Sequence, residues 1–327
     1  MLGELLSGNS PPLRFFSPGW LLIFVLLYGC GTLLVREAAA RWQLQWSVLF
    51  LAVAYGIVEE GLTTKAIFNP RWHGTGMLSG YGMYVGVQWV WAIGVTFFHA
   101  TVSTMIPIAI VEHLWPSSRH SPLLGKTGLG FAFGGFATIT ILGMLSIGTA
   151  EGERTIPFFP RTPLLAVAFA AVVLLCWLAY RFRGREMRTG ALPLIPPVCF
   201  GLAGFFGQAF FLVIPNEMVK QGVQGATAVA VELTVVCLAL AFVFIQLCHH
   251  GVTVRHTTAL VIGSLMPYIL LTPVHEYLWK SSPANPNTGV LAVGIVAAAL
   301  LFVWREAAIG KDRQVQPLPR DGIQSDS

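Results

Sequence analysis

The chain has 327 residues, of which 55% are hydrophobic and 11% are charged; its mean hydropathy is +0.69 and its formal net charge is +5. Soluble domains carry about 25% charged residues, so this composition excludes an ordinary soluble enzyme. The basic residues are dispersed among short loops and form no stripe, which excludes a nucleic-acid-binding surface. We therefore expect an all-α polytopic membrane bundle in the cell membrane, with lipids as its surroundings and no nucleic acid as a partner.

Nine apolar segments are long enough to cross a bilayer, which takes about 20 residues. They cover residues 19–35, 45–67, 84–114, 128–149, 163–182, 194–214, 226–248, 257–274 and 288–304. Residues 1–304 are thus expected to form a single transmembrane domain. Residues 305–327 are polar and contain Pro317 and Pro319, so we expect a disordered cytoplasmic tail there.

The connections between these segments differ in their content of basic residues, and such an excess marks the cytoplasmic side. Every second connection and the C-terminal tail together hold more basic residues than the remaining connections and the N-terminus. The richer set is Arg36, Arg41, Arg119, Lys126, Arg181, Arg183, Arg185, Arg188, Arg255, Arg305, Lys311, Arg313 and Arg320; the poorer set is Arg14, Lys65, Arg71, Arg154, Arg161, Lys220 and Lys280. This alternation predicts an N-terminus outside and a C-terminus in the cytoplasm.

Two adjacent carboxylates, Glu59 and Glu60, interrupt the apolar segment 45–67. An ionisable side chain at membrane depth costs at least about 2.5–3.5 kcal/mol, so such residues usually face a bundle interior or a wet cavity and are functional candidates. Neighbouring residues of a helix point about 100° apart, so at least one of the two should face inward. Thr63 and Thr64, one turn later, can hydrogen-bond to them. A purely structural pair is the alternative.

The third apolar segment carries His99 near its middle. Gln88, Thr96 and Ser103 fall on the same helical face, which predicts a polar stripe that faces the glutamates. Two further polar residues are Gln208, at the sixth segment, and Glu232, inside the seventh. We expect these five residues of the polar faces to line one substrate or ion cavity, with Glu59, Glu60 and His99 as its catalytic group.

Motifs for metals, cofactors and disulfides are missing from the sequence. There is no C-x-x-C pair among the five cysteines, and no H-E-x-x-H, Walker or G-x-S-x-G motif stands in a suitable context. We expect no cofactor and no metal ion.

Residues 45–115 resemble the CAAX-type (ABI/CPBP) membrane glutamate proteases. That family has a Glu-Glu-x-x-x-Arg motif on one helix and a Phe-x-x-x-His motif on the next, to which Glu59-Glu60 and His99 correspond. The chain departs from the pattern, because its basic residue is Lys65, five positions after Glu60 rather than four, and position 95 is valine. The family's later His-x-x-x-Asn/Asp motif is absent. The resemblance implies that Glu59 or Glu60 activates a water molecule and that His99 stabilises the oxyanion.

Three classes of function remain open from the sequence. A membrane-embedded hydrolase uses a glutamate as general base and needs His99 close to it. A proton- or cation-coupled transporter uses the same carboxylates as ion sites that open alternately to the two sides. A non-catalytic membrane assembly or lipid-binding protein requires neither arrangement. The sequence determines neither the substrate nor the oligomeric state.

Overall fold

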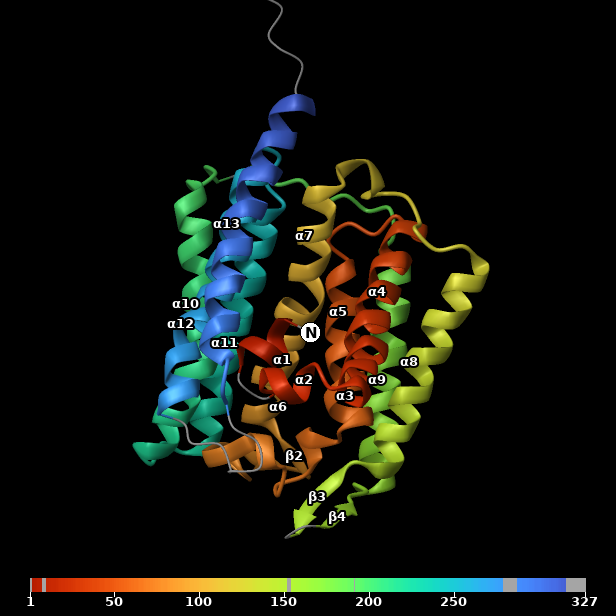
Figure 1. Ribbon diagram of the computed structural model, residues 1–327, viewed down its shortest axis with the longest axis vertical. Helices are drawn as coiled ribbons and strands as arrows, with labels where there is room; N and C mark the ends of the chain where they lie inside the picture. The colour runs from red at the N-terminus through yellow and green to blue at the C-terminus, as the bar shows by residue number, and fades with distance from the viewer. Residues whose placement is uncertain (1, 8–9, 152–153, 191, 279–286, 316–327) are drawn as a thin grey trace, which may run out of the picture.

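The computed structural model describes residues 2–7, 10–151, 154–190, 192–278 and 287–315. It shows a bundle of long, roughly parallel helices with two short β-hairpins at one end (Figure 1). The predicted all-α membrane bundle is thereby confirmed.

The elements follow one another in a simple up-and-down order. They are α1 (Leu2–Leu6), α2 (Pro12–Phe15), α3 (Pro18–Phe24), η1 (Val25–Gly29), α4 (Cys30–Arg41), α5 (Val48–Ile57), η2 (Val58–Thr63), η3 (Ala66–Phe68), η4 (His73–Leu78), β1 (Met83–Tyr84), β2 (Val87–Gln88), α6 (Trp89–Phe98), η5 (His99–Met105), α7 (Ile106–Leu114), η6 (Pro116–Ser118), α8 (Lys126–Ser146), β3 (Gly148–Glu151), β4 (Arg154–Pro157), α9 (Thr162–Arg181), α10 (Pro197–Lys220), α11 (Gly225–Phe242), η7 (Val243–Leu247), α12 (Val254–Tyr277) and α13 (Val290–Val315). The segments η1, η2, η5 and η7 are π-helical turns that continue the adjoining α-helices.

Eight helices within the described ranges are long and apolar enough to cross a membrane. They correspond to eight of the nine predicted segments. The remaining segment, 45–67, forms the shorter pair α5 (10 residues) and η2 (6 residues), which ends before Lys65 takes the left-handed conformation (φ 58°) but still runs from the end of the bundle at Gln43 to the end at Asn69. At the other end of the chain, α13 continues to Val315, so the disorder predicted from residue 305 does not begin there. Helix α13 continues from its apolar part, residues 290–304, into the polar residues that follow. Residues 316–327 lie outside the described part.

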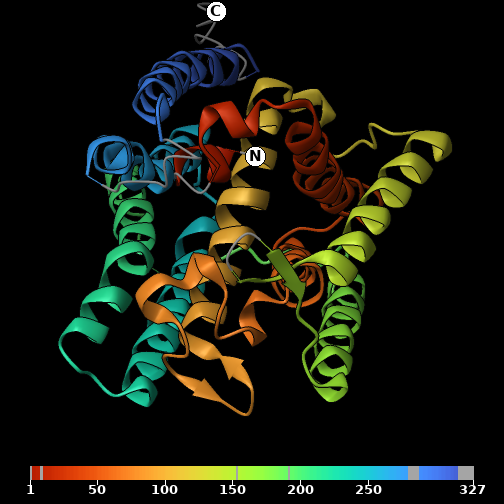
Figure 2. The same ribbon diagram turned by 60° about the horizontal axis from the view of Figure 1, so that its bottom comes forward.

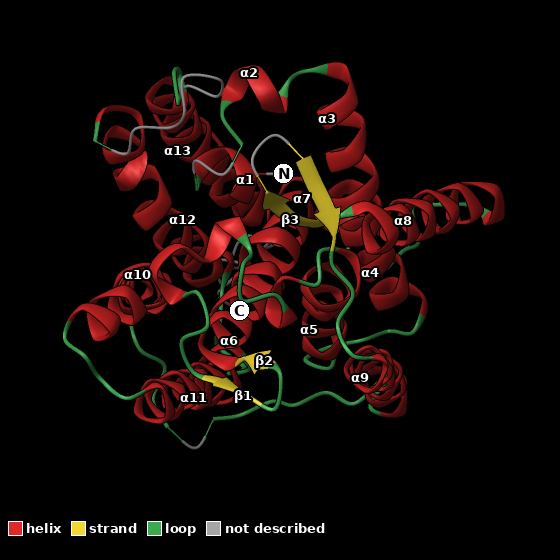
Figure 3. Ribbon diagram, turned by 90° about the horizontal axis from the view of Figure 1, so that it is seen from below, coloured by secondary structure: helices red, strands yellow, loops and turns green. Residues whose placement is uncertain are grey.

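The span formed by α6, η5 and α7 runs through the middle of the molecule (Figures 2 and 3). On one side it packs against α5, and on the other against α11, α12 and α13. Helices α10 and α12 form the closest pair, since a Cβ at Gly263 would overlap the carbonyl oxygen of Gly201. Helix α8 lies at the periphery, and Figure 3 shows it projecting from the bundle. A residue in the middle of the central span therefore contacts both halves.

Two hydrophobic clusters flank this central span. One joins α7 to α12 and α13 through Ile106, Leu265 and Trp304, and it includes Leu6 from the N-terminal helix α1. The other joins α3, α4, α5 and α9 and includes the rings of Tyr28 and Tyr55. The short helix α1 is thus packed inside the bundle rather than on its surface.

The connections segregate to the two ends of the bundle. At the upper end in Figure 1, backbone and side-chain hydrogen bonds join the connections that are predicted to be cytoplasmic: Arg41 Nη2 donates to Leu124 O (2.5 Å), and Gly184 N donates to Gln43 O (3.2 Å). At the lower end, Asn69 Nδ2 donates to Thr149 Oγ1 (3.1 Å). The two predicted sets of connections therefore lie at opposite ends.

The orientation of this bundle in the membrane can be tested with fused reporters. A reporter placed after Arg320 should report a cytoplasmic location, and one inserted at Arg154 should report an external one, because basic residues are retained on the cytoplasmic side. Reversed signals at both positions would invert the orientation. Matching signals at both positions would contradict an odd number of membrane crossings between Arg154 and Arg320, where α9, α10, α11, α12 and α13 lie.

Candidate functional site

Glu59, Glu60 and His99 meet in the interior of the bundle. The imidazole of His99 lies between the two carboxylates: its Nε2 is 3.1 Å from Glu60 Oε1, and its Nδ1 is 3.0 Å from Glu59 Oε2. The three residues are only 1%, 8% and 2% exposed, respectively. Their ligand atoms all lie within 4.8 Å of one another, close enough for one ion to touch all three.

Local helix geometry explains why both glutamates face inward. Residues Val58–Thr63 form a π-helical turn, in which Thr64 N bonds to the carbonyl oxygen of Glu59 five residues earlier. The wider turn reduces the angle between neighbouring side chains below the 100° of an α-helix. Residues His99–Met105 form a second π-helical turn, which begins at the histidine itself. Single π turns are rare and occur frequently at functional sites.

A glycine brings these two π turns together. Gly56 stands one turn before the glutamates, and a Cβ at this position would lie 3.3 Å from the carbonyl oxygen of Thr96 and 3.4 Å from Cβ of His99. Any side chain here would push η5 away from α5. The absence of a side chain at Gly56 therefore allows the imidazole to reach the carboxylates.

Hydroxyl groups surround the cluster and orient it. Ser103 Oγ lies 3.0 Å from His99 Nδ1, and Thr64 Oγ1 donates to Glu60 Oε2 (3.3 Å). Tyr28 and Tyr55 lie close enough to Glu59 to interact with it electrostatically, while the hydroxyl of Tyr55 donates to Leu27 O (3.3 Å). The ring of Tyr28 also stacks on His99, with 6.1 Å between centroids and 25° between planes.

One oxygen of the cluster lacks a hydrogen-bond donor. Glu59 Oε2 is buried and accepts no hydrogen bond from the described residues, although it lies 3.0 Å from His99 Nδ1, because that nitrogen is directed at Ser103 Oγ. A buried carboxylate oxygen without a donor costs free energy. Glu59 is thus poised to accept a proton from a bound molecule or to bind a cation.

Glu4 of helix α1 adds a third carboxylate beside the cluster. Its Oε1 accepts a hydrogen bond from Tyr28 Oη (2.7 Å), and its Oε2 accepts one from Ser10 Oγ (2.9 Å). Glu4, Tyr28 and Tyr55 were not predicted from the sequence as site residues. Glu4 precedes the first apolar segment, and the two tyrosines resemble ordinary core aromatics. Tyr55 could have been found from its spacing, because residues four apart on a helix lie on the same face and Tyr55 stands four residues before Glu59.

Of the five residues predicted to line the cavity, only Ser103 contacts the catalytic group in the structure. Gln88 precedes α6 and fixes the loop below it, donating from Nε2 to Ala66 O (3.0 Å) and Asn69 O (2.8 Å). Thr96 meets Gly56 through its backbone. Helical spacing predicted one polar face for Gln88, Thr96 and Ser103, but Gln88 lies in β2, before the helix begins, so the spacing does not apply to it.

Gln208 and Glu232 lie apart from the cluster. Gln208 links α10 to its neighbours, since its Nε2 donates to Thr101 Oγ1 (2.7 Å) and its Oε1 accepts from Tyr268 Oη (2.9 Å). Glu232 is fully buried on α11, which packs mainly against α6. Both of its carboxylate oxygens lack a hydrogen-bond partner among the described residues.

Lys65, the basic residue after the glutamate pair, serves a different part of the fold. Its buried ammonium donates to the carbonyl oxygens of Gly143 (3.3 Å), Met144 (2.5 Å) and Ile147 (2.7 Å) at the end of α8. The last carbonyls of a helix have no partner within it, and a cation there is favourable. Lys65 therefore caps α8, and neither of the two site glutamates forms an ion pair with it in the described structure.

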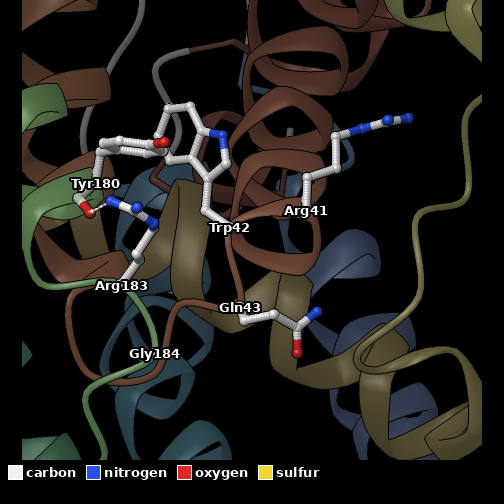
Figure 4. A pocket seen from close by; sticks show the side chains of 6 residues that line it. All are labelled: Arg41, Trp42, Gln43, Tyr180, Arg183 and Gly184. Carbon is white, nitrogen blue, oxygen red and sulfur yellow. Dashed lines mark hydrogen bonds between the residues drawn. The ribbon is translucent and has the colours of Figure 1, made fainter.

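A surface pocket of about 510 Å³ occurs at the upper end of the bundle, far from this cluster (Figure 4). Trp42, Tyr180 and Arg183 line it together with Arg41 and Gly184. Arg183 lies over the ring of Tyr180, and Arg41 points away from it. Its charged groups do not converge, so the buried cluster is the better candidate for a functional site.

Comparisons with known proteins agree with the membrane fold. The pattern of an uncharacterized membrane protein family matches residues 1–315. The chain belongs to this family. A protein of Archaeoglobus fulgidus, described as an uncharacterized protein, is 29% identical over 139 residues, which are 40% of this chain and 42% of that protein. The chain thus aligns with less than half of that relative, and no solved structure matches it.

Replacing Glu232 by glutamine should stabilise the protein. An unpaired carboxylate is more costly to bury than an amide of the same shape. The midpoint of thermal unfolding in detergent should rise for Glu232→Gln and stay unchanged for Glu217→Gln, whose carboxylate is solvent-exposed and paired with Lys220. A lower midpoint for Glu232→Gln would show that its carboxylate has a stabilising partner.

Replacing Lys65 by methionine should destabilise the protein. The change leaves three carbonyl oxygens of α8 without their donor, at a cost of roughly 1–3 kcal/mol for a buried unsatisfied group. The same thermal measurement should show a clear drop for Lys65→Met and little change for Lys126→Met, at the exposed start of α8. Equal midpoints for the two variants would refute the capping role.

Proposed function

We propose that this protein is a hydrolase embedded in the cell membrane, in which Glu59, Glu60 and His99 activate water against an acyl bond of a membrane-associated substrate. The observation that carries the proposal is the position of His99, within 3.1 Å of one glutamate and 3.0 Å of the other. Of the three classes open from the sequence, a hydrolase is the one that requires this contact.

The geometry assigns a role to each residue of the cluster. Glu59 Oε2 accepts no hydrogen bond, so it can accept the proton of an attacking water. Water oxygen then bonds to the carbonyl carbon, the bond to the leaving group breaks, and the proton passes to the leaving group. The imidazole of His99, held by Glu60 and Ser103, donates a hydrogen bond to the developing oxyanion.

Two further features favour an active site over a structural pair. Three of the π-helical turns in the described chain carry members of the site: Tyr28 in η1, the glutamates in η2, and His99 with Ser103 in η5. A structural pair gains nothing from such irregular helices, whereas functional sites frequently use them. The resemblance to CAAX-type glutamate proteases supports peptide bonds as the substrate class.

Hydrolysis can be detected without a known substrate by oxygen labelling. Purified protein is reconstituted with solubilised membrane proteins in ¹⁸O-water, and mass spectrometry counts peptides whose new C-terminal carboxylates carry ¹⁸O. Glu59→Gln should lower this count by roughly 10²–10⁴-fold, the usual contribution of a general base. Glu60→Gln and His99→Gln should also lower it, by smaller factors because they act on the orientation and the oxyanion.

Glu112→Gln is the matched control, since Glu112 lies near the end of the span that carries His99 at its middle and pairs with Arg119 (3.4 Å). It should retain full labelling. Labelling that is equal in the parent protein, Glu59→Gln and a protein-free sample would overturn the proposal.

A further inference from the structure

The cluster has more negative charge than its basic residue can balance. In the described structure, Glu59 and Glu60 form ion pairs with His99 alone. One imidazole supplies at most one positive charge against two carboxylates, and Glu4 adds a third carboxylate nearby. Uncompensated charge is expensive inside an apolar bundle. The site therefore favours a bound cation.

The donor atoms are suited to a metal ion. Glu59, Glu60 and His99 each offer one ligand atom within 4.8 Å of the other two, and Glu59 Oε2 is buried without a hydrogen-bond partner. Two carboxylates and one imidazole give a mixed oxygen and nitrogen set, which suits divalent ions such as zinc. Three protein ligands with a remaining position for water are typical of catalytic zinc sites.

We infer that Glu59, Glu60 and His99 bind one divalent transition-metal ion, with zinc as the first choice. His99 Nδ1 lies 3.0 Å from Ser103 Oγ, so Nε2, which faces Glu60, would be the ligand. Two carboxylates, a neutral imidazole and a divalent ion sum to zero charge. This inference differs from the sequence-based expectation that the chain holds no metal.

Groups around the ligands already hold them in place. Thr64 donates to Glu60, and Ser103 fixes the ring of His99, on which the ring of Tyr28 also stacks. Metal-binding histidines generally use their second ring nitrogen in this way, and removing such a partner weakens metal binding by roughly 10–100-fold. The role of the ion rests on the proposed function: with His99 as its ligand, the ion rather than the imidazole would stabilise the oxyanion, and it would also hold the attacking water.

Zinc binding to the full chain tests the inference. The protein is purified in detergent without a polyhistidine tag, stripped with a chelator, dialysed against Zn²⁺, and its bound zinc is measured by mass spectrometry. We expect about one zinc per chain, in accord with the one such cluster among the described residues. Glu59→Gln, Glu60→Gln and His99→Gln should reduce it to background, whereas Ser103→Ala should weaken the affinity by roughly 10–100-fold.

Two controls locate the ion. Glu112→Gln should leave the zinc content unchanged. His250→Ala tests the stacked pair His249–His250 at the other end of the bundle, whose rings are 4.3 Å apart. Loss of zinc in His250→Ala with retention in the three cluster variants would overturn the inference.

Cobalt provides a measurement that needs no variant and is therefore independent of how the variants fold. Co²⁺ in a four-coordinate site of oxygen and nitrogen ligands absorbs visible light much more strongly than aqueous Co²⁺, so the stripped parent protein should develop a visible band when Co²⁺ fills the three-ligand site with one water. A parent protein that binds neither zinc nor cobalt would overturn the inference. Full ¹⁸O labelling by that protein in chelator would leave the hydrolase proposal standing, whereas stoichiometric zinc without labelling would overturn the hydrolase alone.

Discussion

The contact of one histidine with two buried carboxylates governs the architecture of this protein. Carboxylates inside an apolar bundle must be paired or hydrogen-bonded, because their desolvation is otherwise too costly. His99 is brought to Glu59 and Glu60 by the central span, by two π-helical turns and by the close approach at Gly56. The long outer helices enclose this contact and keep it away from lipid.

The membrane fold could be predicted well from the sequence. Spanning segments need a long run of apolar residues, and this requirement is visible in hydropathy alone. Their exact ends were less predictable. Lys65 ends the second helix because its ammonium caps α8, a partner far away in the chain. Helix α13 likewise continues to Val315 beyond its apolar part.

The site was only partly visible in the sequence. The cost of a charge in a membrane singled out Glu59, Glu60 and His99, and the structure places these residues together. Helical periodicity failed for Gln88, because it stands before α6 in a short strand. Glu4 could not be found from a local pattern, because its link to the site is a hydrogen bond to Tyr28 across the fold. The π-helical turns have no sequence signature.

The position of helix α1 has a consequence for how the protein is made. Its Leu6 packs with Leu265 of α12 and Trp304 of α13, the final two long helices of the described chain. The ribosome synthesises α1 long before these helices enter the bilayer, so the residues against which Leu6 packs are not all present until translation is nearly over. The packing of Leu6 is therefore completed late in biogenesis, whereas Ser10 and Tyr28, the partners of Glu4, are already made when the chain reaches α4.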